Sequence, residues 1–379
     1  MNLLMISGDR SLAEDKRGAF YNTLEEFHKH WDRVDIIVPR IKNYELRITN
    51  VFGNVFIHTS PWTLIFQPFW IYREGLRILK ANGYSLMAKN YLMTVHDYPP
   101  FYNGLGAYLL NLATRVPYVL EIHHIPGYPK AANLKEWIYK VFARLFIKID
   151  SSRAKLVRVV NKNQTPDFLI KAGVPEGKIA YISSMYIDLD IFKPMNLPKK
   201  YDLIFVGRLA ENKGINLLLE AVKLSIINLQ FPIKCLIVGD GPLETFCKLK
   251  IENWKLRDKV LMYGRAKDSS EIARLLNESK ILIMPSYNEG GPRVVVEAMA
   301  CGVPVLATPV GIAPDLLKNG SGGEIITWDV KDIVLKIRAL LNDSDGYKRY
   351  GLTGSEIVKQ FEKKETIRNY ADKLKEILG

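Results

Sequence analysis

Two glutamates lie on either side of a break in an otherwise apolar stretch near the end of the chain. The stretch MPSYNEGGPRVVVEAMACGVPVLATPVG contains Glu289, Gly290, Gly291 and Glu297 in this order. ILIMPS is predicted to be a strand and YNEGGP its exit loop, where the glycines let the backbone approach a ligand closely. The helix that follows directs its unpaired N–H groups toward the loop. This pattern predicts an anion site, at which one carboxylate can meet a sugar and the other a ribose hydroxyl.

Two cations are expected at another strand exit of the same sheet. Arg208 directly follows YDLIFVG, and Lys213 with Gly214 opens the next helix. In open parallel sheets, ligands bind at the carboxyl ends of the strands, so two cations and two helix N-termini there suit a diphosphate. The alternative is that Glu289 only complements the helix dipole, which is worth roughly 0.3 to 1 kcal/mol, and that Glu297 is a solvated helix residue.

Short apolar runs that end in turn residues alternate with longer helical segments, as is typical of parallel α/β sheets. The runs predicted to be strands are NLLMIS, VDIIVP, NVFIHT, MTVHDY, YVLEIHH, LVRVVN and IAYIS in the first half, and YDLIFVGR, KCLIVGDG, VLMYGR, ILIMPS and PVLATP in the second. Two doubly wound domains are therefore expected, over residues 1–198 and 199–354. The polar segment DIFKPMNLPKKYD is the predicted linker, and residues from about 355 to 379 are predicted to form one periodic helix.

Composition and charge limit the class of protein. The chain has 379 residues, of which 48% are hydrophobic and 25% charged, as in ordinary globular proteins. No apolar run approaches the roughly 20 residues of a membrane span, and MNLLMISGDRSL does not resemble a secretory signal, so a cytoplasmic location is expected. Cys235, Cys247 and Cys301 suit reduced packing residues, without the spacing of a zinc site. The net charge of +13 predicts an anionic partner, either nucleic acid, a phospholipid surface or phosphorylated small molecules.

Four segments, in their order and spacing, resemble the donor-binding half of the retaining glycosyltransferases of family 4. They are FVGRLAENKG, LIVGDGP, VLMYGRAKD and MPSYNEGGPRVVVEAMACGVPVLAT. The resemblance implies the GT-B fold, in which two Rossmann-like, doubly wound parallel-sheet domains face each other across a cleft and the C-terminal helix returns to the first domain. It also implies a hexosyltransferase that moves a sugar from a UDP- or GDP-sugar to a carbohydrate or lipid-linked acceptor, in cell-envelope or polysaccharide biosynthesis.

The same resemblance implies roles for the residues that bind the donor. Arg208 and Lys213 would neutralise the diphosphate, the backbone N–H groups of Arg293 and Val294 would hold a phosphate, and Glu297 would bind the ribose hydroxyls. Because fixed cations and helix N-termini meet the leaving diphosphate in this family, neither a metal ion nor a cofactor is expected.

Glu289 would face the donor sugar. Retention is explained in the family by attack on the same face, in which the leaving phosphate helps to take the acceptor's proton, so Glu289 is expected to position and stabilise the sugar. The nucleotide base is expected to meet backbone groups near Gly264, Arg265 and Ala266.

The first half of the chain matches the family less closely. His123 and His124 follow the strand YVLEI, and the family usually has a histidine at the first of these positions, where it contacts the donor sugar. His96, in TVHDYPP, is a second candidate contact. Gly18 opens a predicted helix and is a candidate contact for the donor phosphate or the acceptor.

Two basic, aromatic stretches of the first half indicate a peripheral membrane contact on the inner face of the membrane. They are SPWTLIFQPFWIYREGLRILK and NLKEWIYKVFARLFIKIDSSRAKLVRV. Basic amphipathic segments with aromatic residues can lie in the lipid headgroup region. The alternative is that their apolar faces simply pack against the sheet.

Two other functions remain open at this point. One is a non-catalytic, basic GT-B homologue that acts as a scaffold or binds nucleic acid, and the other is a nucleotide-sugar epimerase. No nucleic-acid reading motif is found, so no nucleic-acid partner is expected. The family pattern around Glu297 favours a transferase over an epimerase.

Overall fold

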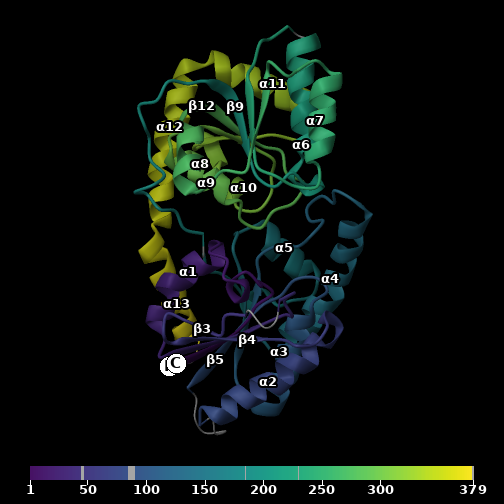
Figure 1. Cartoon of the computed structure of the whole chain (residues 1–379), viewed down its shortest axis with the longest axis vertical. Helices are drawn as coiled ribbons and strands as arrows, with labels where there is room; N and C mark the ends of the chain where they lie inside the picture. Colours follow the sequence, from purple (N-terminus) through teal and green to yellow (C-terminus); the bar gives the residue numbers. More distant parts are fainter. Residues whose placement is uncertain (44–46, 84–89, 184, 229, 378–379) are drawn as a thin grey trace. The chain divides into compact units, whose positions relative to one another are not determined.

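The computed structural model describes residues 1–43, 47–83, 90–183, 185–228 and 230–377, and its chain divides into two compact units (Figure 1). Unit 1 comprises residues 1–125, 138–184 and 364–379, and unit 2 comprises residues 126–137 and 185–363. The chain therefore passes into unit 2 twice: first for the short segment 126–137, and again at residue 185, which lies before the predicted linker. The last two residues of the predicted C-terminal helix lie outside the described residues.

Unit 1 is built on an eight-stranded sheet whose strand order is β3-β4-β2-β1-β5-β6-β7-β8. All neighbouring strands are parallel except β3 and β4, which are antiparallel. The bounds are β1 Asn2–Ile6, β2 Arg33–Val38, β3 Asn50–Val51, β4 Val55–Thr59, β5 Tyr91–His96, β6 Tyr118–Ile122, β7 Leu156–Val159 and β8 Ile179–Tyr181. The chain runs outward from β1 to one edge and then, from β5 on, to the other, which is the pattern of a doubly wound sheet.

The direction of each crossover decides which face of this sheet a helix covers, because such crossovers are right-handed. α2, α3, α4 and α5 all follow strands that step toward β8 and so cover one face, whereas α1 covers the other, where α13 also lies (Figure 1). The bounds are α1 Ala19–Phe27, α2 Gln67–Ala81, α3 Tyr102–Thr114, α4 Leu134–Ser152, α5 Gln164–Lys171 and α13 Lys363–Glu376. Glycines bring α3 close to both of its neighbours: a Cβ on Gly106 would stand 2.8 Å from Ile71 of α2, and a Cβ on Gly104 would stand 2.5 Å from Asp150 of α4.

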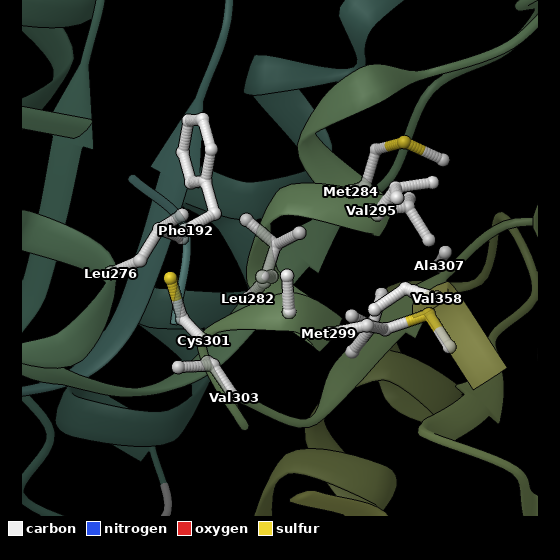
Figure 2. Packing of buried hydrophobic residues seen from close by; sticks show 14 of the residues in the cluster. Phe192, Leu276, Leu282, Met284, Val295, Met299, Cys301, Val303, Ala307 and Val358 are labelled. Carbon is white, nitrogen blue, oxygen red and sulfur yellow. The ribbon is translucent and has the colours of Figure 1, made fainter. Parts of the chain in front are cut away.

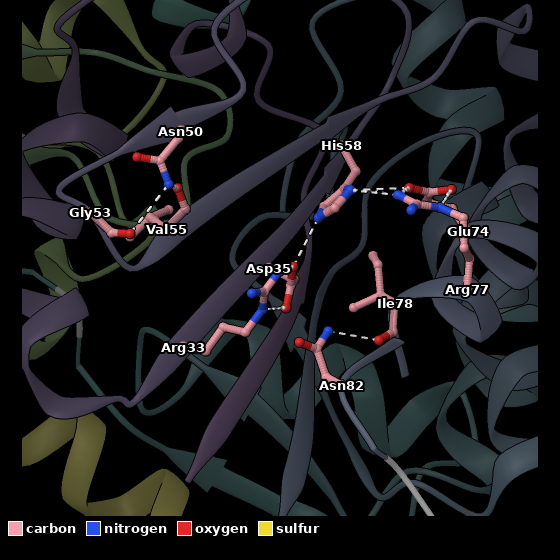
Figure 3. A network of polar contacts seen from close by, with 10 residues as sticks. All are labelled: Arg33, Asp35, Asn50, Gly53, Val55, His58, Glu74, Arg77, Ile78 and Asn82. Carbon is pink, nitrogen blue, oxygen red and sulfur yellow. Dashed lines mark hydrogen bonds and ion pairs between the residues drawn. The ribbon is translucent and has the colours of Figure 1, made fainter. Parts of the chain in front are cut away.

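A buried polar network ties α2 to the edge of this sheet (Figure 3). His58 Nε2 lies 2.9 Å from Asp35 Oδ1, and His58 Nδ1 lies 3.0 Å from Glu74 Oε1 of α2. Arg33 completes the pairing of Asp35, and Arg77 pairs with Glu74. Burial alone would lower the pKa of His58, but the hydrogen bonds to Asp35 and Glu74 outweigh it and raise that pKa. The network therefore satisfies the buried charges that hold α2 in place.

Unit 2 is built on a six-stranded parallel sheet with the order β11-β10-β9-β12-β13-β14. Its strands are β9 Tyr201–Val206, β10 Cys235–Val238, β11 Val260–Gly264, β12 Ser279–Met284, β13 Val305–Ala307 and β14 Gly323–Ile325. Its helices are α6 Ile215–Lys223, α7 Glu244–Asn253, α8 Ser269–Asn277, α9 Arg293–Ala300, α10 Ala313–Leu316, α11 Val330–Asn342 and α12 Ser344–Ile357. The order of the strands in the chain reverses between β9 and β12, which are neighbours.

Alternate residues of β12 pack into the two layers of unit 2 because side chains of a strand point to opposite faces. Leu282 and Met284 join the cluster that includes Val295 and Met299 of α9 (Figure 2). Ile281 and Ile283 join the cluster that is formed with helices α6, α7 and α11. Both faces of β12 are thus buried, which explains its continuous apolar sequence.

The structure confirms every run that was predicted to be a strand, adds two short strands and corrects the prediction for the C-terminal helix. β3 and β14, which have two and three residues, were not predicted. The single C-terminal helix is wrong: α12 ends at Ile357, and α13 begins only at Lys363. Between them Glu362 has an extended backbone and pairs with Ile187, so a tertiary contact interrupts the helical periodicity.

The three cysteines are free and buried, as predicted. Burial raises the pKa of Cys235 and of Cys301 to about 12, and that of Cys247 to about 11. They are therefore packing residues that stay as thiols. Among the described residues, no helix is both long enough and apolar enough to cross a membrane.

Candidate functional site

The exits of β9 and β12 meet at the point where the strand order of unit 2 reverses. The backbone N–H of Tyr287, after β12, donates to the carbonyl of Asn212, after β9, at 2.8 Å. Gly214 has a φ of +67°, and a Cβ there would stand 2.0 Å from the carbonyl oxygen of Pro285, so only glycine fits. Ligands of open α/β sheets bind at such a switch point. The predicted anion-binding loops are therefore adjacent.

Lys213 and Glu289 form an ion pair between these two loops. Lys213 Nζ donates to Glu289 Oε1, and Ser286 Oγ donates to the same oxygen at 3.1 Å. The two side chains remain 27% and 13% exposed, so both are within reach of a ligand. Sequence analysis expected Lys213 to meet the diphosphate and Glu289 to meet the sugar. In the structure the two side chains bind each other.

Ser286 is itself fixed by two side chains that sequence reasoning missed. Its carbonyl oxygen accepts hydrogen bonds from Thr308 Oγ1 at 2.5 Å and from Trp328 Nε1 at 2.9 Å. Thr308 follows β13, and Trp328 follows β14. The two strands beyond β12 thus position the hydroxyl that holds Glu289, and no motif in the sequence signals this arrangement.

The N-terminus of α9 lies four residues after Glu289. The helix begins at Arg293, so the N–H groups of Arg293 and Val294 belong to its first turn, which has no preceding carbonyl to bond. The guanidinium of Arg293 lies over the ring of Tyr186, 4.5 Å from its centroid. Gly290 is buried, and Gly291 is half-buried. The backbone of this turn can therefore hold an anion, while the Arg293 side chain is already engaged.

Glu297 lies one turn into α9 and is half-buried. Burial raises the pKa of Glu297 to about 7, and the opposing effect of Arg293 is smaller. An ionised carboxylate at this place lacks the full stabilisation that water would give, so hydroxyl donors from a ligand would favour its charged form.

We expect Glu297 to make nucleotide binding depend on pH. If the ionised form binds the ribose hydroxyls, a pKa of about 7 in the free protein predicts an affinity for UDP up to about tenfold lower at pH 6 than at pH 8. Calorimetric titration of UDP at both pH values measures this ratio. Glu297→Gln keeps the shape but cannot ionise, so it should lose the protein's part of the effect. An identical pH dependence in the two proteins would remove Glu297 from the ribose.

The other predicted donor contacts lie at strand exits of the same sheet. Arg208 follows β9 and is exposed. Gly264 ends β11 with a φ of +83°, and its carbonyl accepts the N–H of Gly239 at 2.7 Å, which joins the exits of β10 and β11. Arg265 and Ala266 follow it. These residues line the edge at which the carboxyl ends of β9, β10 and β11 emerge.

The segment 126–137 packs against the exit loop of β12, which sequence analysis did not predict. Asn288 Nδ2 donates to the carbonyl of Lys130 at 3.0 Å and to Glu136 Oε2 at 2.8 Å. Asn288 is buried and stands next to Glu289. A segment that is distant in sequence therefore helps to shape this loop.

The same segment also reaches the loop after β9. Asn133 Nδ2 donates to Glu211 Oε2. The ammonium of Lys130 lies 5.3 Å from the ring centroid of Tyr287 and 5.0 Å from that of Trp328. Cation–π contacts of this kind fix a lysine without a carboxylate. Unit 2 therefore holds a further ordered cation, Lys130, near the loop that carries Glu289.

His123 of unit 1 is held by a buried arginine. Arg158, only 1% exposed, donates from Nη1 to Glu121 Oε1 at 2.9 Å and lies 3.1 Å from His123 Nε2. A guanidinium can only donate, so His123 Nε2 accepts and the ring proton is on Nδ1. The ring of His96 stacks on His123 with centroids 4.5 Å apart, and burial lowers the pKa of His96 to about 3. His96 therefore supports His123 as a neutral ring.

The C-terminal helix α13 completes this network. Tyr370 donates its hydroxyl to Glu121 Oε1, and the Arg158 guanidinium lies 4.0 Å from the centroid of the Tyr370 ring. Burial alone would raise the pKa of Glu121, but the charge of Arg158 and the hydrogen bond from Tyr370 hold that pKa well below its usual range. Sequence analysis selected His123 but missed Glu121, Arg158 and Tyr370, because no short spacing connects them.

The remaining predicted positions of unit 1 give simpler results. Gly18 precedes α1 as expected, and open space surrounds the position of its missing Cβ. His124 follows His123 and is half-buried. The structure thus leaves Gly18 accessible at the start of a helix.

An Asp-x-Asp segment precedes the first strand of unit 2. Asp188 and Asp190 have Asp-x-Asp spacing, but Asp188 Oδ1 accepts the backbone N–H of Asp190 at 3.1 Å as part of a local turn. No group of three or more His, Cys, Asp or Glu side chains with metal-binding geometry occurs among the described residues.

Known proteins share both the sequence pattern and the fold of this chain. Residues 188–356 match the family Glycosyl transferases group 1. An uncharacterized glycosyltransferase of Methanocaldococcus jannaschii is 27% identical over 86% of this chain and 89% of its own length. The capsular polysaccharide biosynthesis glycosyltransferase CapM of Staphylococcus aureus is 30% identical, over 40% of this chain and 39% of its own length.

A solved structure extends the fold comparison to the whole chain. The Anabaena protein HepE, solved in complex with UDP and glucose, has a TM-score of 0.73 and 19% identity, and the match covers 99% of this chain and all of that one. Two parallel-sheet α/β units, each with a switch point, are the architecture of GT-B enzymes. Residues 188–356 therefore belong to the glycosyl transferases group 1 family, and the chain is a glycosyltransferase of the GT-B fold.

Proposed function

We propose that this enzyme transfers a sugar from a nucleoside-diphosphate sugar to a carbohydrate or lipid-linked acceptor, with retention of configuration and without a metal ion. The observation that carries the proposal is the ion pair of Lys213 and Glu289 at the switch point of unit 2, four residues before the N-terminus of α9. The Lys213 ammonium suits a diphosphate, and the Glu289 carboxylate suits a sugar.

The charges of the site match those that develop in the reaction. Cleavage of a glycosyl phosphate bond leaves negative charge on the diphosphate and positive charge on the sugar. Lys213, Arg208 and the first N–H groups of α9 can stabilise the diphosphate, and the Glu289 carboxylate can stabilise the sugar. Because Ser286 fixes Glu289 before the ligand arrives, this stabilisation needs little reorganisation.

The acceptor step is assigned to a same-face mechanism. The acceptor hydroxyl attacks the anomeric carbon on the side from which the diphosphate departs, the bond to the phosphate oxygen breaks, and that phosphate takes the acceptor's proton. His123, with its proton on Nδ1, is proposed to donate a hydrogen bond to a hydroxyl of the donor sugar. No protein nucleophile is required, and Glu289 keeps its charge throughout.

The choice of donor rests on related proteins. HepE was solved with UDP and glucose, and CapM is named for capsular polysaccharide biosynthesis. We therefore place a UDP-sugar first and a GDP-sugar second, and a polysaccharide precursor as the acceptor. The same proposal includes a cytoplasmic location with peripheral contact to the inner face of the membrane.

A ligand screen followed by a transfer assay tests this function. UDP-, GDP- and ADP-sugars are compared for thermal stabilisation, and a ligand at 100 times its dissociation constant should add roughly 2.7 kcal/mol of stability. The stabilising donor is then incubated with candidate acceptors, with and without EDTA, and NMR determines the anomeric configuration of the product. We expect a retained configuration and unchanged activity in EDTA.

Each arm of this experiment has an outcome that contradicts the proposal. Loss of activity in EDTA that magnesium or manganese restores would overturn metal independence, and an inverted product would overturn the same-face step. Conversion of the donor sugar without an acceptor would indicate an epimerase. No stabilisation by any nucleotide sugar would indicate a non-catalytic homologue.

A further inference from the structure

Helix α4 has apolar side chains on two opposite faces. Its inner face, which includes Ala143 and Ile147, is buried in unit 1. Its outer face carries five large apolar residues that are 39–58% exposed: Ile138, Val141, Phe142, Leu145 and Ile149. Their spacing of three or four residues places all five on one stripe of the helix surface. Packing against the sheet explains the inner face only.

Basic side chains border this outer stripe. Lys135, Arg144 and Lys148 are exposed on the same helix, and Lys140 is half-buried. Asp150, which belongs to the inner face, is fully buried, so it does not offset these charges at the surface. The first 198 residues contain 25 basic and 17 acidic residues, a net charge of +8. The exposed side of α4 is therefore both apolar and positively charged.

A second exposed apolar group lies at the start of α2. Ile65, Phe66 and Phe69 are 53–64% exposed, and Arg73 and Arg77 are exposed on the next turns. α2 and α4 lie on either side of α3 and cover the same face of the unit 1 sheet (Figure 1). The exposed residues of both helices point away from that sheet, so the two groups belong to the outer side of one helical layer.

We infer that this outer layer, defined by the exposed apolar residues of α2 and α4, is a docking surface for an anionic membrane. The charge complementarity selects the occupant: a second copy of the chain would bring two like-charged surfaces together, whereas anionic headgroups would neutralise them. Aromatic and aliphatic side chains would enter the boundary of headgroups and acyl chains, and the lysine and arginine side chains would remain at the headgroups. This inference rests on the membrane contact that the proposed function includes, and it names the surface that makes that contact; it does not depend on the transfer reaction.

The test uses the full chain and vesicles of defined composition. Wild type and Phe142→Asp/Leu145→Asp are sedimented with phosphatidylcholine vesicles that contain none or 30% phosphatidylglycerol, at low and at 0.5 M salt. Leu335→Asp and Leu352→Asp are the matched controls, because these leucines of unit 2 are 66% and 72% exposed but lie on α11 and α12. Circular dichroism and UDP binding are measured on all proteins.

We expect wild type and both controls to bind the anionic vesicles, and the double variant to bind them at least tenfold more weakly. Binding should also fall at high salt, because screening weakens the contribution of the basic residues. Equal vesicle binding by the double variant and wild type would overturn the inference. So would a wild type that is dimeric without lipid together with a double variant that is monomeric. If the double variant no longer binds vesicles but still binds UDP, the membrane surface is tested independently of the proposed transfer function.

Discussion

Glu289→Gln is expected to lower turnover by at least about tenfold, or roughly 1.4 kcal/mol of activation barrier, while the protein keeps its affinity for free UDP. The substitution preserves shape but removes the charge that would stabilise the sugar as positive charge develops on it. Because the carboxylate also pairs with Lys213 in the unliganded protein, its removal frees that ammonium for the diphosphate. Affinity for UDP should therefore stay the same or rise.

Lys213→Ala should change the same ion pair in the opposite way. This variant removes a cation from the diphosphate both in the ground state and as the bond breaks, so both affinity and turnover should fall. The loss of one preorganised donor to developing negative charge typically costs 10²-fold or more in turnover, and we expect about 10² here. Steady-state kinetics with one donor and acceptor, together with calorimetric titration of UDP, measure both variants.

The chain provides a matched control for this pair. Asp202 and Lys280 form an ion pair of 2.8 Å between the same two strands, β9 and β12, at their amino ends, where no ligand is expected. Asp202→Asn and Lys280→Ala should leave UDP affinity and turnover close to wild type. If Lys213→Ala binds UDP as well as these controls do, Lys213 does not contact the diphosphate, and the donor site is misplaced.

Arg158→Leu should destabilise unit 1 by about 3 to 5 kcal/mol, because it leaves the buried Glu121 without its cation. Glu121 would keep the hydrogen bond from Tyr370 but lose its cation, in an environment that disfavours its charge. Trp31 offers a local probe of unfolding, since its ring centroid lies 5.7 Å from that of Phe27, which in turn stacks on Tyr370 at 4.8 Å. Urea titration followed by tryptophan fluorescence gives the change.

Two further variants provide a control and a comparison for this change in stability. Arg368→Leu changes an exposed arginine of α13, and surface substitutions of this kind usually alter stability by no more than about 0.5 kcal/mol. Tyr370→Phe removes one hydrogen bond to a charged group and should cost about 1.5 to 3 kcal/mol. If Arg158→Leu unfolds at the same urea concentration as Arg368→Leu, the buried network does not stabilise unit 1.

The sequence predicted the positions of the loops after β9 and β12 well, because a buried strand and its exit loop have one physical cause. A strand that is buried on both faces is a continuous apolar run, and its exit loop begins where that run stops, so Arg208, Lys213 and Glu289 could be assigned to strand exits directly. The strand order then brings the exits of β9 and β12 together. Neither step requires knowledge of side-chain packing.

The residues that were missed depend on packing between distant parts of the chain. Thr308 and Trp328 reach Ser286 only because β13 and β14 continue the sheet beside β12. Asn288 meets Lys130 and Glu136 across more than a hundred and fifty positions of sequence. Such contacts leave no periodicity or spacing that could be read in advance.

Helix α4 shows a different limit of sequence reasoning. Both of its faces are apolar, so periodicity alone could not tell which residues would be buried and which would be exposed. The alternative that its apolar residues simply pack against the sheet is correct for Ala143 and Ile147 and wrong for the exposed stripe that includes Phe142 and Leu145. Only the position of α3 and of the sheet distinguishes the two faces.

The contact of Tyr370 with Glu121 also affects the timing of folding during synthesis. Most of unit 1 is translated before unit 2, but the helix that completes its buried charge network emerges only after unit 2. About 210 residues separate Arg158 from Tyr370, and at 5 to 20 residues per second a ribosome needs roughly 10 to 40 s to add them. During that interval Glu121 and Arg158 lack their phenol partner, while the intervening residues of unit 2 are already being added. The unit that is made first is therefore the one whose fold is completed last.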